Sequence, residues 1–419
     1  MYWLYGLGLA VFFAGMLPAV LVQMLVRGKY RRGLGERLGR VRPWDGPARP
    51  IWLHAVSVGE AMAAAPLAKE LRARHPEIPL LVSTATETGR SVAEQRLPAE
   101  RFVFFPLDFG WAVAPALDRL RPRLVLLTET EIWPNFLAAC AERGVALAVV
   151  NGRISPRSFR RYRLARPWLS RILRDIRLFC MQSEDDAARI LALGAVADRV
   201  RVTGNVKFDL PAGQVNPAEV RGRLGLPKSR RLVVGGSTHR GEEEPLLRAF
   251  TGALASRPDL CLLLAPRHPD RLEEVERLVA RFRLGCLRRS RLPGPPLDGV
   301  GVVLLDTVGE LASLYAAAQV VFIGGSLIPH GGQNLLEPAA HGRPVLHGPS
   351  MHNFAEMRAL FDGAGAALQV EGAEDLQRHL EALLDDSERA DRMGETGRAI
   401  LDAHRGATRR TADLVGSLL

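Results

Sequence analysis

Apolar residues gather in short uninterrupted runs, and from residue 51 onward these runs alternate with stretches of helical periodicity. Continuous runs, unlike alternating apolar and polar positions, are typical of strands that helices cover on both faces. Regular alternation of strand and helix predicts parallel sheets joined by right-handed crossovers. We therefore expect an α/β fold with strands at residues 51–56, 80–86, 102–107, 124–130, 146–151, 178–183, 200–205, 231–237, 260–267, 302–307, 320–326 and 344–349.

The alternation is interrupted over residues 208–224, where proline and glycine break the pattern. We interpret this stretch as a linker between two doubly wound, Rossmann-like domains, 51–207 and 225–419, that face each other across a cleft. Ligands of such sheets bind beyond the carboxyl ends of the strands. Residues that directly follow the predicted strands are therefore the candidates for chemistry.

The first 26 residues carry no charge, and twelve of them are Leu, Val or Phe. As a helix this segment would be about 39 Å long, enough to cross the ~30 Å hydrocarbon core of a bilayer with some tilt. A cleaved signal peptide would begin with basic residues, which here come only after the apolar run. We predict a retained anchor over 1–26 and a basic juxtamembrane segment over 27–50, with everything that follows in the cytoplasm.

The net charge of +11 is concentrated in two segments. Residues 27–42 sum to +6 and residues 153–177 to +8, which leaves −3 for the rest of the chain. Within 153–177 apolar residues recur at helical spacing between arginines, which predicts an amphipathic helix with a basic face. A solvated surface helix is the alternative interpretation. Because no nucleic-acid-binding motif accompanies this segment and the anchor places it near a membrane, we expect anionic membrane lipids as its partner, and no nucleic acid.

Motifs that the sequence lacks exclude several chemistries. The four cysteines are scattered without a C-x-x-C pair, which excludes a cysteine zinc site. The sequence contains no Walker loop, no H-E-x-x-H, and no G-x-G-x-x-G between a strand and a helix. It also lacks D-x-D, so we expect neither a bound metal nor a cofactor.

Carboxylates follow two predicted strands in the first domain. Glu60 of HAVSVGE (54–60) lies at the start of a predicted helix. It is either a carboxylate favoured there by the helix dipole or a general base directed into the cleft, although the dipole lowers its pKa and so weakens it as a base. Glu129 and Glu131 of LVLLTETEIWPN (124–135) should share one side of a strand end. They are either exposed loop acids or residues that hold the substrate or support Glu60.

Candidate anion-binding residues follow strands in the second domain. Arg267 comes directly after an apolar strand and is either a solvated loop residue or a ligand for phosphate. Residues 320–350 contain two glycine pairs before a helix that should begin near Asn334. Glycine lets a backbone approach a ligand closely, and the free amides at the start of a helix attract phosphate. Glu337 either reaches back to cap this helix or accepts hydrogen bonds from a ribose diol. These features make the second domain the nucleotide binder.

Six motifs, in this order, resemble the bacterial 3-deoxy-D-manno-octulosonic acid (Kdo) transferases of lipopolysaccharide assembly. They are HAVSVGE (54–60), TETEIWPN (128–135), GNVKFD (204–209), PRHP (266–269), GEL (309–311) and GGSLIPHGGQNLLEPAAHGRPVLHGP (324–349). The resemblance implies a GT-B glycosyltransferase fold with one N-terminal membrane anchor. It also implies metal-independent, inverting transfer of Kdo from CMP-Kdo to a lipid A precursor at the cytoplasmic face of the inner membrane.

The resemblance further implies a role for individual residues. Glu60 is similar to the catalytic base, and Glu131 and Lys207 are similar to residues that support the transition state. The CMP site of the family corresponds to Pro266, Arg267, His268, Gly309, Glu310, Leu311, Asn334, Leu335, Leu336 and Glu337. The alternatives are another GT-B transferase that uses a UDP-sugar, and a non-catalytic membrane scaffold that binds anionic lipid.

Overall fold

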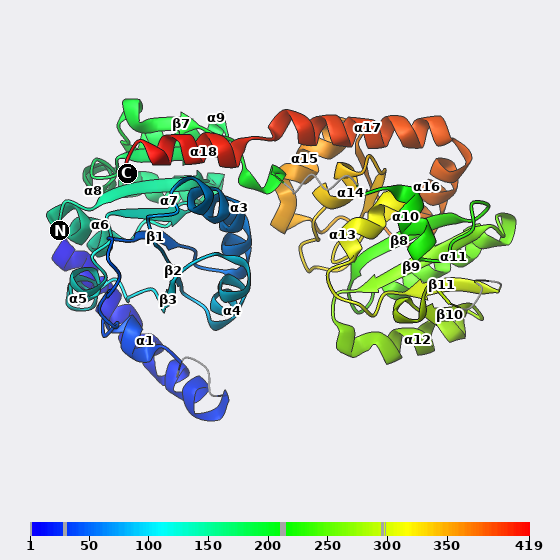
Figure 1. The fold of residues 1–419 in the computed structure, drawn as a ribbon, viewed down its shortest axis with the longest axis horizontal. Coiled ribbons are helices and arrows are strands. Elements are labelled where there is room, and N and C mark those ends of the chain that lie inside the picture. The colour runs from blue at the N-terminus through cyan, green and yellow to red at the C-terminus, as the bar shows by residue number, and fades with distance from the viewer. Residues whose placement is uncertain (1, 28–31, 210–214, 295–296, 298) are drawn as a thin grey trace. The chain divides into compact units, whose positions relative to one another are not determined.

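The structure, a computed structural model, describes residues 2–27, 32–209, 215–294, 297 and 299–419. The chain forms two compact units, which we describe separately (Figure 1). Unit 1 comprises Met1–Asp209 and His404–Leu419, and unit 2 comprises Leu210–Ala403. Each unit contains one seven-stranded sheet. The prediction of two α/β domains is confirmed.

The sheet of unit 1 has the strand order β3-β2-β1-β4-β5-β6-β7. Every neighbouring pair is parallel, as the strand–helix alternation predicted. All seven strands fall within the predicted apolar runs or one residue beyond them. Their bounds are β1 Ile51–His54, β2 Leu80–Thr84, β3 Arg101–Phe104, β4 Leu124–Thr128, β5 Ala146–Gly152, β6 Leu178–Met181 and β7 Val200–Val202.

Both faces of this sheet are buried, which explains the continuous apolar runs. In β1, Trp52 packs with Phe136 in the core on one face, and the next residue, Leu53, packs with Val82 in the core on the other. The helices of unit 1 are α1 Tyr2–Arg27, α2 Leu34–Arg37, α3 Val58–Arg74, α4 Glu87–Arg96, α5 Gly110–Leu120, α6 Pro134–Glu142, α7 Pro156–Leu164, α8 Arg166–Leu173, α9 Glu184–Leu193 and α18 Ala407–Gly416.

The sheet of unit 2 has the strand order β10-β11-β9-β8-β12-β13-β14, again parallel throughout. Five strands match predicted runs, namely β8 Arg231–Thr238, β9 Leu260–Pro266, β11 Val300–Leu304, β12 Val320–Ile323 and β13 Val345–His347. Two edge strands, β10 Gly285–Arg288 and β14 Ala367–Gln369, were not predicted. The helices of this unit are α10 Pro217–Arg223, α11 Glu243–Ser256, α12 Leu272–Arg281, α13 Leu311–Leu314, α14 Leu336–Ala340, α15 Ala355–Gly363, α16 Ala373–Asp385 and α17 Ser387–His404.

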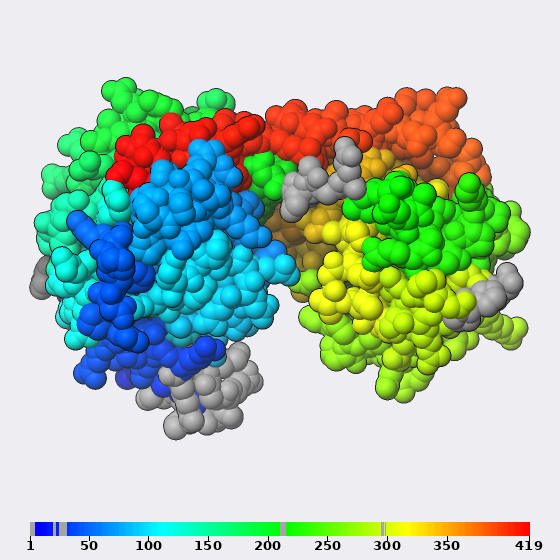
Figure 2. All heavy atoms as spheres, in the orientation of Figure 1, coloured from blue at the N-terminus to red at the C-terminus, as the bar shows by residue number. Residues whose placement is uncertain are grey.

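The N-terminal helix α1 packs on unit 1 through aromatic side chains. The Tyr5 ring lies 5.5 Å from that of Trp168, and the Phe13 ring lies 5.8 Å from that of Phe109, measured between centroids. Figure 2 shows atoms of the N-terminal segment, in dark blue, on the outside of unit 1. Across the described part of the chain, no helix combines the length and the apolar character that crossing a membrane requires. The spanning anchor expected over residues 1–26 is therefore not shown.

The arginine-rich segment 153–177 differs from the single helix that was predicted. It forms two helices, α7 and α8, which meet at Ala165, immediately before Arg166-Pro167. The apolar positions Leu169 and Ile172 are buried in the core of unit 1, so they hold α8 on the domain and are not available to lipid. The arginines of both helices remain on the surface.

The C-terminal boundary of the second domain also differs from the expected 225–419. Unit 2 ends at Ala403, and α18 returns to unit 1, where Ala412 and Val415 join a core face of the sheet. Asp209 caps the start of α18, because its carboxylate accepts hydrogen bonds from the Gly406 amide at 2.6 Å and the Thr408 amide at 2.5 Å. Part of the predicted linker, residues 210–214, lies outside the described residues, and the rest includes α10.

Candidate active site

Glu60 is held at the start of α3 by a capping box. The Ser57 hydroxyl caps the helix, accepts from the Glu60 amide at 3.4 Å and donates to Glu60 Oε1 at 3.0 Å. The Val56 amide donates to Glu60 Oε2 at 2.8 Å. These bonds fix the carboxylate at the carboxyl end of β1, and the residue is only 8% exposed.

Burial determines the basicity of Glu60. Desolvation raises its pKa, and this effect outweighs the hydrogen bonds from Val56 and Ser57, which lower it. The negative charge of Glu129 raises the pKa further. The expectation that the helix dipole leaves Glu60 with a lowered pKa is therefore wrong, and Glu60 is a stronger base than its position on the helix suggested.

The end of β4 brings two more carboxylates to Glu60. Burial raises the pKa of Glu131 to about 7, and the charges of Glu60 and Glu129 add to this effect. Glu129 has a φ of 61°, in the left-handed region. The two acids therefore do not alternate as in a regular strand, although both interact electrostatically with Glu60, as the prediction of a supporting group requires.

Lys207 completes this group of charges in unit 1. Its Nζ lies 4.0 Å from Glu129 Oε1. A 3₁₀ turn, Val206–Phe208, carries Lys207, and the Asn151 side chain accepts from the Val206 amide at 3.1 Å. The three residues to which the sequence assigned catalysis, Glu60, Glu131 and Lys207, are thus brought together, with Glu129 between them.

Sequence analysis missed two residues that shape this site. The Tyr162 side chain on α7 is close enough to Glu131 for its charge to raise the tyrosine pKa, after the larger effect of burial. Asn151 has a φ of 53° and is 1% exposed at the end of β5, beside β4. Non-glycine residues with positive φ concentrate at functional sites. In the sequence, the only sign of a special role for Asn151 was that a polar residue ends the predicted apolar run at 146–151.

In unit 2, Arg267 and Glu337 form the counterpart of this site. Asn334 Nδ2 donates to Glu337 Oε1 at 3.2 Å, and Asn334 Oδ1 accepts from the Leu336 amide at 3.0 Å. Burial raises the pKa of Glu337, against the lowering effects of Asn334 and of the Arg267 charge. The Arg267 guanidinium is exposed and makes no ion pair or hydrogen bond with any residue that the structure describes. An unpaired arginine beside a buried carboxylate suits a ligand with both phosphate and hydroxyl groups.

Backbone amides in the glycine-rich segment after β12 already have partners within the protein. The buried Glu242 carboxylate accepts from the amides of Gly325 at 2.5 Å, Ser326 at 2.8 Å and Leu327 at 2.9 Å. The helix that should have begun near Asn334 begins at Leu336 and has five residues. The first amide of this helix, that of Leu336, donates to Asn334 Oδ1, so it is not the bare amide that was expected to attract phosphate.

The remaining predicted CMP residues differ in what their side chains contact. Glu310 accepts from Arg289 at 3.0 Å and from the Thr307 hydroxyl at 2.6 Å, and it also pairs with Arg223. Its carboxylate is therefore occupied by the protein itself. Pro266 ends β9, His268 follows it on the surface, Gly309 and Leu311 flank Glu310, and Leu335 and Leu336 are buried.

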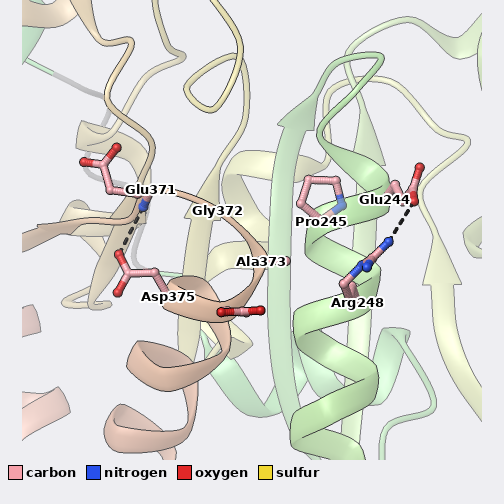
Figure 3. Close-up of a pocket in the computed structure, with 8 residues that line it drawn as sticks. Glu244, Pro245, Arg248, Glu371, Gly372, Ala373 and Asp375 are labelled. Atoms are coloured by element: carbon pink, nitrogen blue, oxygen red, sulfur yellow. Dashed lines mark hydrogen bonds and ion pairs between the residues drawn. The ribbon is translucent and has the colours of Figure 1, made fainter.

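One hollow of unit 2, about 500 Å³ in volume, lies apart from these residues (Figure 3). It lies between the starts of α11 and α16, and Glu244, Glu371, Glu374 and Asp375 line it with Arg248. Four carboxylates against one guanidinium disfavour an anionic ligand there. The candidate nucleotide site is therefore defined by Arg267, Asn334 and Glu337.

Comparisons with known proteins find relatives that match nearly the whole chain. A family model described as 3-deoxy-D-manno-octulosonic-acid transferase matches residues 32–210. The chain is 34% identical over 391 residues to the 3-deoxy-D-manno-octulosonic acid transferase of Haemophilus influenzae, which covers 92% of this chain and 91% of that protein. It is 37% identical over 423 residues to the transferase of the same name from Bordetella pertussis, and the match covers 95% of this chain and 96% of that protein.

Solved structures resemble the fold at lower sequence identity. A glycosyltransferase from Rickettsia africae superimposes with a TM-score of 0.57 at 12% identity, over 89% of this chain and 99% of that one. The UDP-GlcNAc 2-epimerase of Neisseria meningitidis superimposes with a TM-score of 0.55 at 15% identity, over 84% and 98%. These likenesses support the two-unit fold alone. The full-length relatives identify the chemistry: the chain belongs to the 3-deoxy-D-manno-octulosonic acid transferase family of glycosyltransferases.

Proposed function

We propose that this chain transfers Kdo from CMP-Kdo to a hydroxyl group of a lipid A precursor, with Glu60 as the general base. The observation that carries the proposal is the gathering of Glu60, Glu131 and Lys207 at one edge of the unit 1 sheet. These are the residues that the family resemblance implied, and family membership supplies the reaction class.

The proposed chemistry needs one proton transfer and one displacement. Glu60 takes the proton of the acceptor hydroxyl as its oxygen attacks the anomeric carbon of Kdo, the bond from that carbon to the phosphate oxygen breaks, and CMP leaves with the bonding electrons. The raised pKa of Glu60 favours this step, because a base works best when its pKa approaches the working pH. Lys207 contributes positive charge beside the three glutamates. That the transfer needs no metal remains a prediction.

The donor site that we propose lies in unit 2. Arg267 would hold the CMP phosphate, because its planar guanidinium is unpaired and can donate two parallel hydrogen bonds. Glu337, oriented by Asn334, would accept hydrogen bonds from the ribose hydroxyls. The Asn334 side chain would keep its present contacts with the Glu337 carboxylate and the Leu336 amide. The Glu310 side chain would shape this site without touching the nucleotide.

We also propose that unit 1 binds the inner membrane through α1, α7 and α8. Leu7, Val11 and Val22 are each more than half exposed and lie on the side of α1 away from Tyr5 and Phe13. The Trp168 ring of α8 contacts the Tyr5 ring of α1, so α8 with its arginines lies next to this helix. Apolar side chains next to unpaired cations suit the interface of an anionic bilayer. The acceptor would then be presented to unit 1 by the membrane.

Substitution of Glu60 tests the base. We expect Glu60→Gln to lower kcat by about 10²- to 10⁴-fold, because Gln keeps the contact with the Val56 amide but cannot take a proton. Ser57→Ala is the matched control, since it removes the other capping contact and leaves the carboxylate. Turnover would be followed by mass spectrometry of the product formed from CMP-Kdo and a lipid A precursor.

Nucleotide binding distinguishes the proposal from its alternatives. CMP, but not UDP, should raise the melting temperature of both the wild type and Glu60→Gln, because the base does not belong to the nucleotide site. Stabilisation by UDP alone would favour a transferase that uses a UDP-sugar. Undiminished turnover by Glu60→Gln would remove Glu60 from the role of base.

A further inference from the structure

Three histidines meet beside Arg267 in unit 2. His239 follows β8, His268 follows β9, and His330 lies in the loop after β12. The ring of His239 lies 3.9 Å from that of His330 and 5.4 Å from that of His268, measured between centroids. Three imidazoles from three separate loops thus gather at the carboxyl edge of one sheet, where ligands of such folds bind.

His239 forms the floor of this cluster. It is 6% exposed, and its Nε2 lies 3.2 Å from Gln333 Nε2, whereas His268 and His330 are exposed at the rim. Burial lowers the pKa of His239 to about 4, and the charges of His330, His268, Arg267 and Arg271 lower it further. His239 is therefore neutral at pH 7, and when its Nε2 accepts from the Gln333 amide its Nδ1 carries the proton.

Among the described residues, no carboxylate forms an ion pair with any of these three rings, in contrast to His347 and His379 of the same unit. The two acids that follow His239 most closely along the chain are engaged elsewhere. Glu242 accepts from backbone amides, including that of His239 at 2.9 Å, and Glu243 pairs with Arg271 at 2.9 Å. Nor do the described residues include a group of histidines, cysteines and acids arranged to hold a metal ion. The cluster thus combines N–H donors with the positive charge of Arg267, and no carboxylate of the described residues is paired with its rings, which is the composition of an anion site.

We propose that His239, His268 and His330 bind the carboxylate that the sugar of the donor carries beside its phosphate. The inference rests on the proposed function. In CMP-Kdo the anomeric carbon bears both the phosphate and a carboxylate, so the sites for these two anions must adjoin. His268 directly follows Arg267, and the Arg267 charge acts on His239 as well as on Glu337. The cluster would therefore select nucleotide-linked acidic sugars over neutral ones.

The test compares a ligand that has this carboxylate with one that lacks it. We expect His330→Ala and His239→Gln each to raise KM for CMP-Kdo by about 10- to 100-fold, the effect of losing a hydrogen bond to a charged group. The Kd for CMP, measured by calorimetry, should change less than twofold. His379→Ala on α16, a histidine that contacts Asp375, is the matched control and should leave both constants unchanged. Because His330 is exposed, its variant should fold even if the buried His239 does not tolerate replacement.

Two outcomes of these measurements would contradict the assignment of the histidines to the sugar carboxylate. A parallel loss of CMP and CMP-Kdo binding would show that the histidines hold the phosphate. An unchanged KM for CMP-Kdo in His330→Ala and His268→Ala would show that they hold no part of the donor. Either result would overturn the inference. Transfer by the wild-type chain is measured first, before any variant is made. If the wild-type chain transferred no Kdo, the proposed function would be overturned together with this inference.

Discussion

At the scale of single residues, the raised pKa of Glu131 makes the stability of the protein depend on pH. The folded state holds Glu131 with a pKa of about 7, above the ordinary value of 4.5, so between pH 4.5 and 7 it binds more protons than the unfolded state. The free energy of unfolding therefore falls as the pH rises through this window, by at most about 3 kcal/mol. Glu131→Gln should be more stable than the wild type at pH 8 and equally stable at pH 4, as measured by urea unfolding.

The same substitution should lower turnover, because Glu131 interacts electrostatically with Glu60 and Gln carries no charge. Glu142→Gln, at an exposed acid on α6, is the control and should show neither effect. A Glu131→Gln variant with wild-type stability at every pH would mean that Glu131 is solvated and apart from Glu60.

These residues also show how far sequence reasoning reaches. Glu60 and Glu131 were predicted because each follows an apolar strand, and parallel strands end at one edge. The left-handed backbone of Glu129 and Asn151 was not predicted, because nothing in a non-glycine residue signals a positive φ. The histidine cluster was missed for a related reason: it depends on loops that are distant along the chain.

At the scale of elements, α1 carries the clearest prediction about the membrane. Leu7→Asp with Val11→Asp should weaken flotation with vesicles of anionic lipid by at least about tenfold, because two apolar side chains no longer enter the interface. Val308→Asp, at an apolar residue of unit 2 that is 85% exposed, is the control. Equal flotation of the double variant and the control would exclude α1 from the lipid-binding surface.

The elements that sequence analysis missed share a physical cause. β10 and β14 form the two edges of the unit 2 sheet, where a strand has a neighbouring strand on one side only. The segments Gly285–Arg288 and Ala367–Gln369 accordingly lack the strong apolar run of the central strands. In 153–177 the helical periodicity was correctly recognised. Its apolar positions, however, proved to be core contacts of α8, because periodicity shows which face is covered and not what covers it.

At the scale of the whole molecule, the chain crosses between the units twice. The sequence indicated the first crossing, near residues 208–224, through its prolines and glycines. The return to unit 1 was not predicted, because α17 and α18 are consecutive helices and Ala412 and Val415 are small residues with no distinctive pattern. Unit 1 is therefore completed only by the last residues of the chain.

This topology predicts that deletion of residues 404–419 destabilises unit 1, although the deleted residues follow unit 2 in the sequence. A chain that ends at Ala403 uncovers the core that Ala412 and Val415 close and leaves Asp209 without the amides that it caps. Hydrogen exchange followed by mass spectrometry should show faster exchange in β1 and α3, with β8 and β9 unchanged.

A milder variant separates the cap from the packing. Asp209→Ala should lower the free energy of unfolding of unit 1 by about 1–3 kcal/mol, because it removes both hydrogen bonds to the start of α18 while the helix itself remains. Asp198→Ala, in an exposed turn of the same unit, provides the comparison. If the truncated chain kept wild-type protection in β1, α18 would be an appendage of unit 1 and not part of its core. Since the three candidate catalytic side chains all project from unit 1, turnover in these variants should fall in step with its loss of protection.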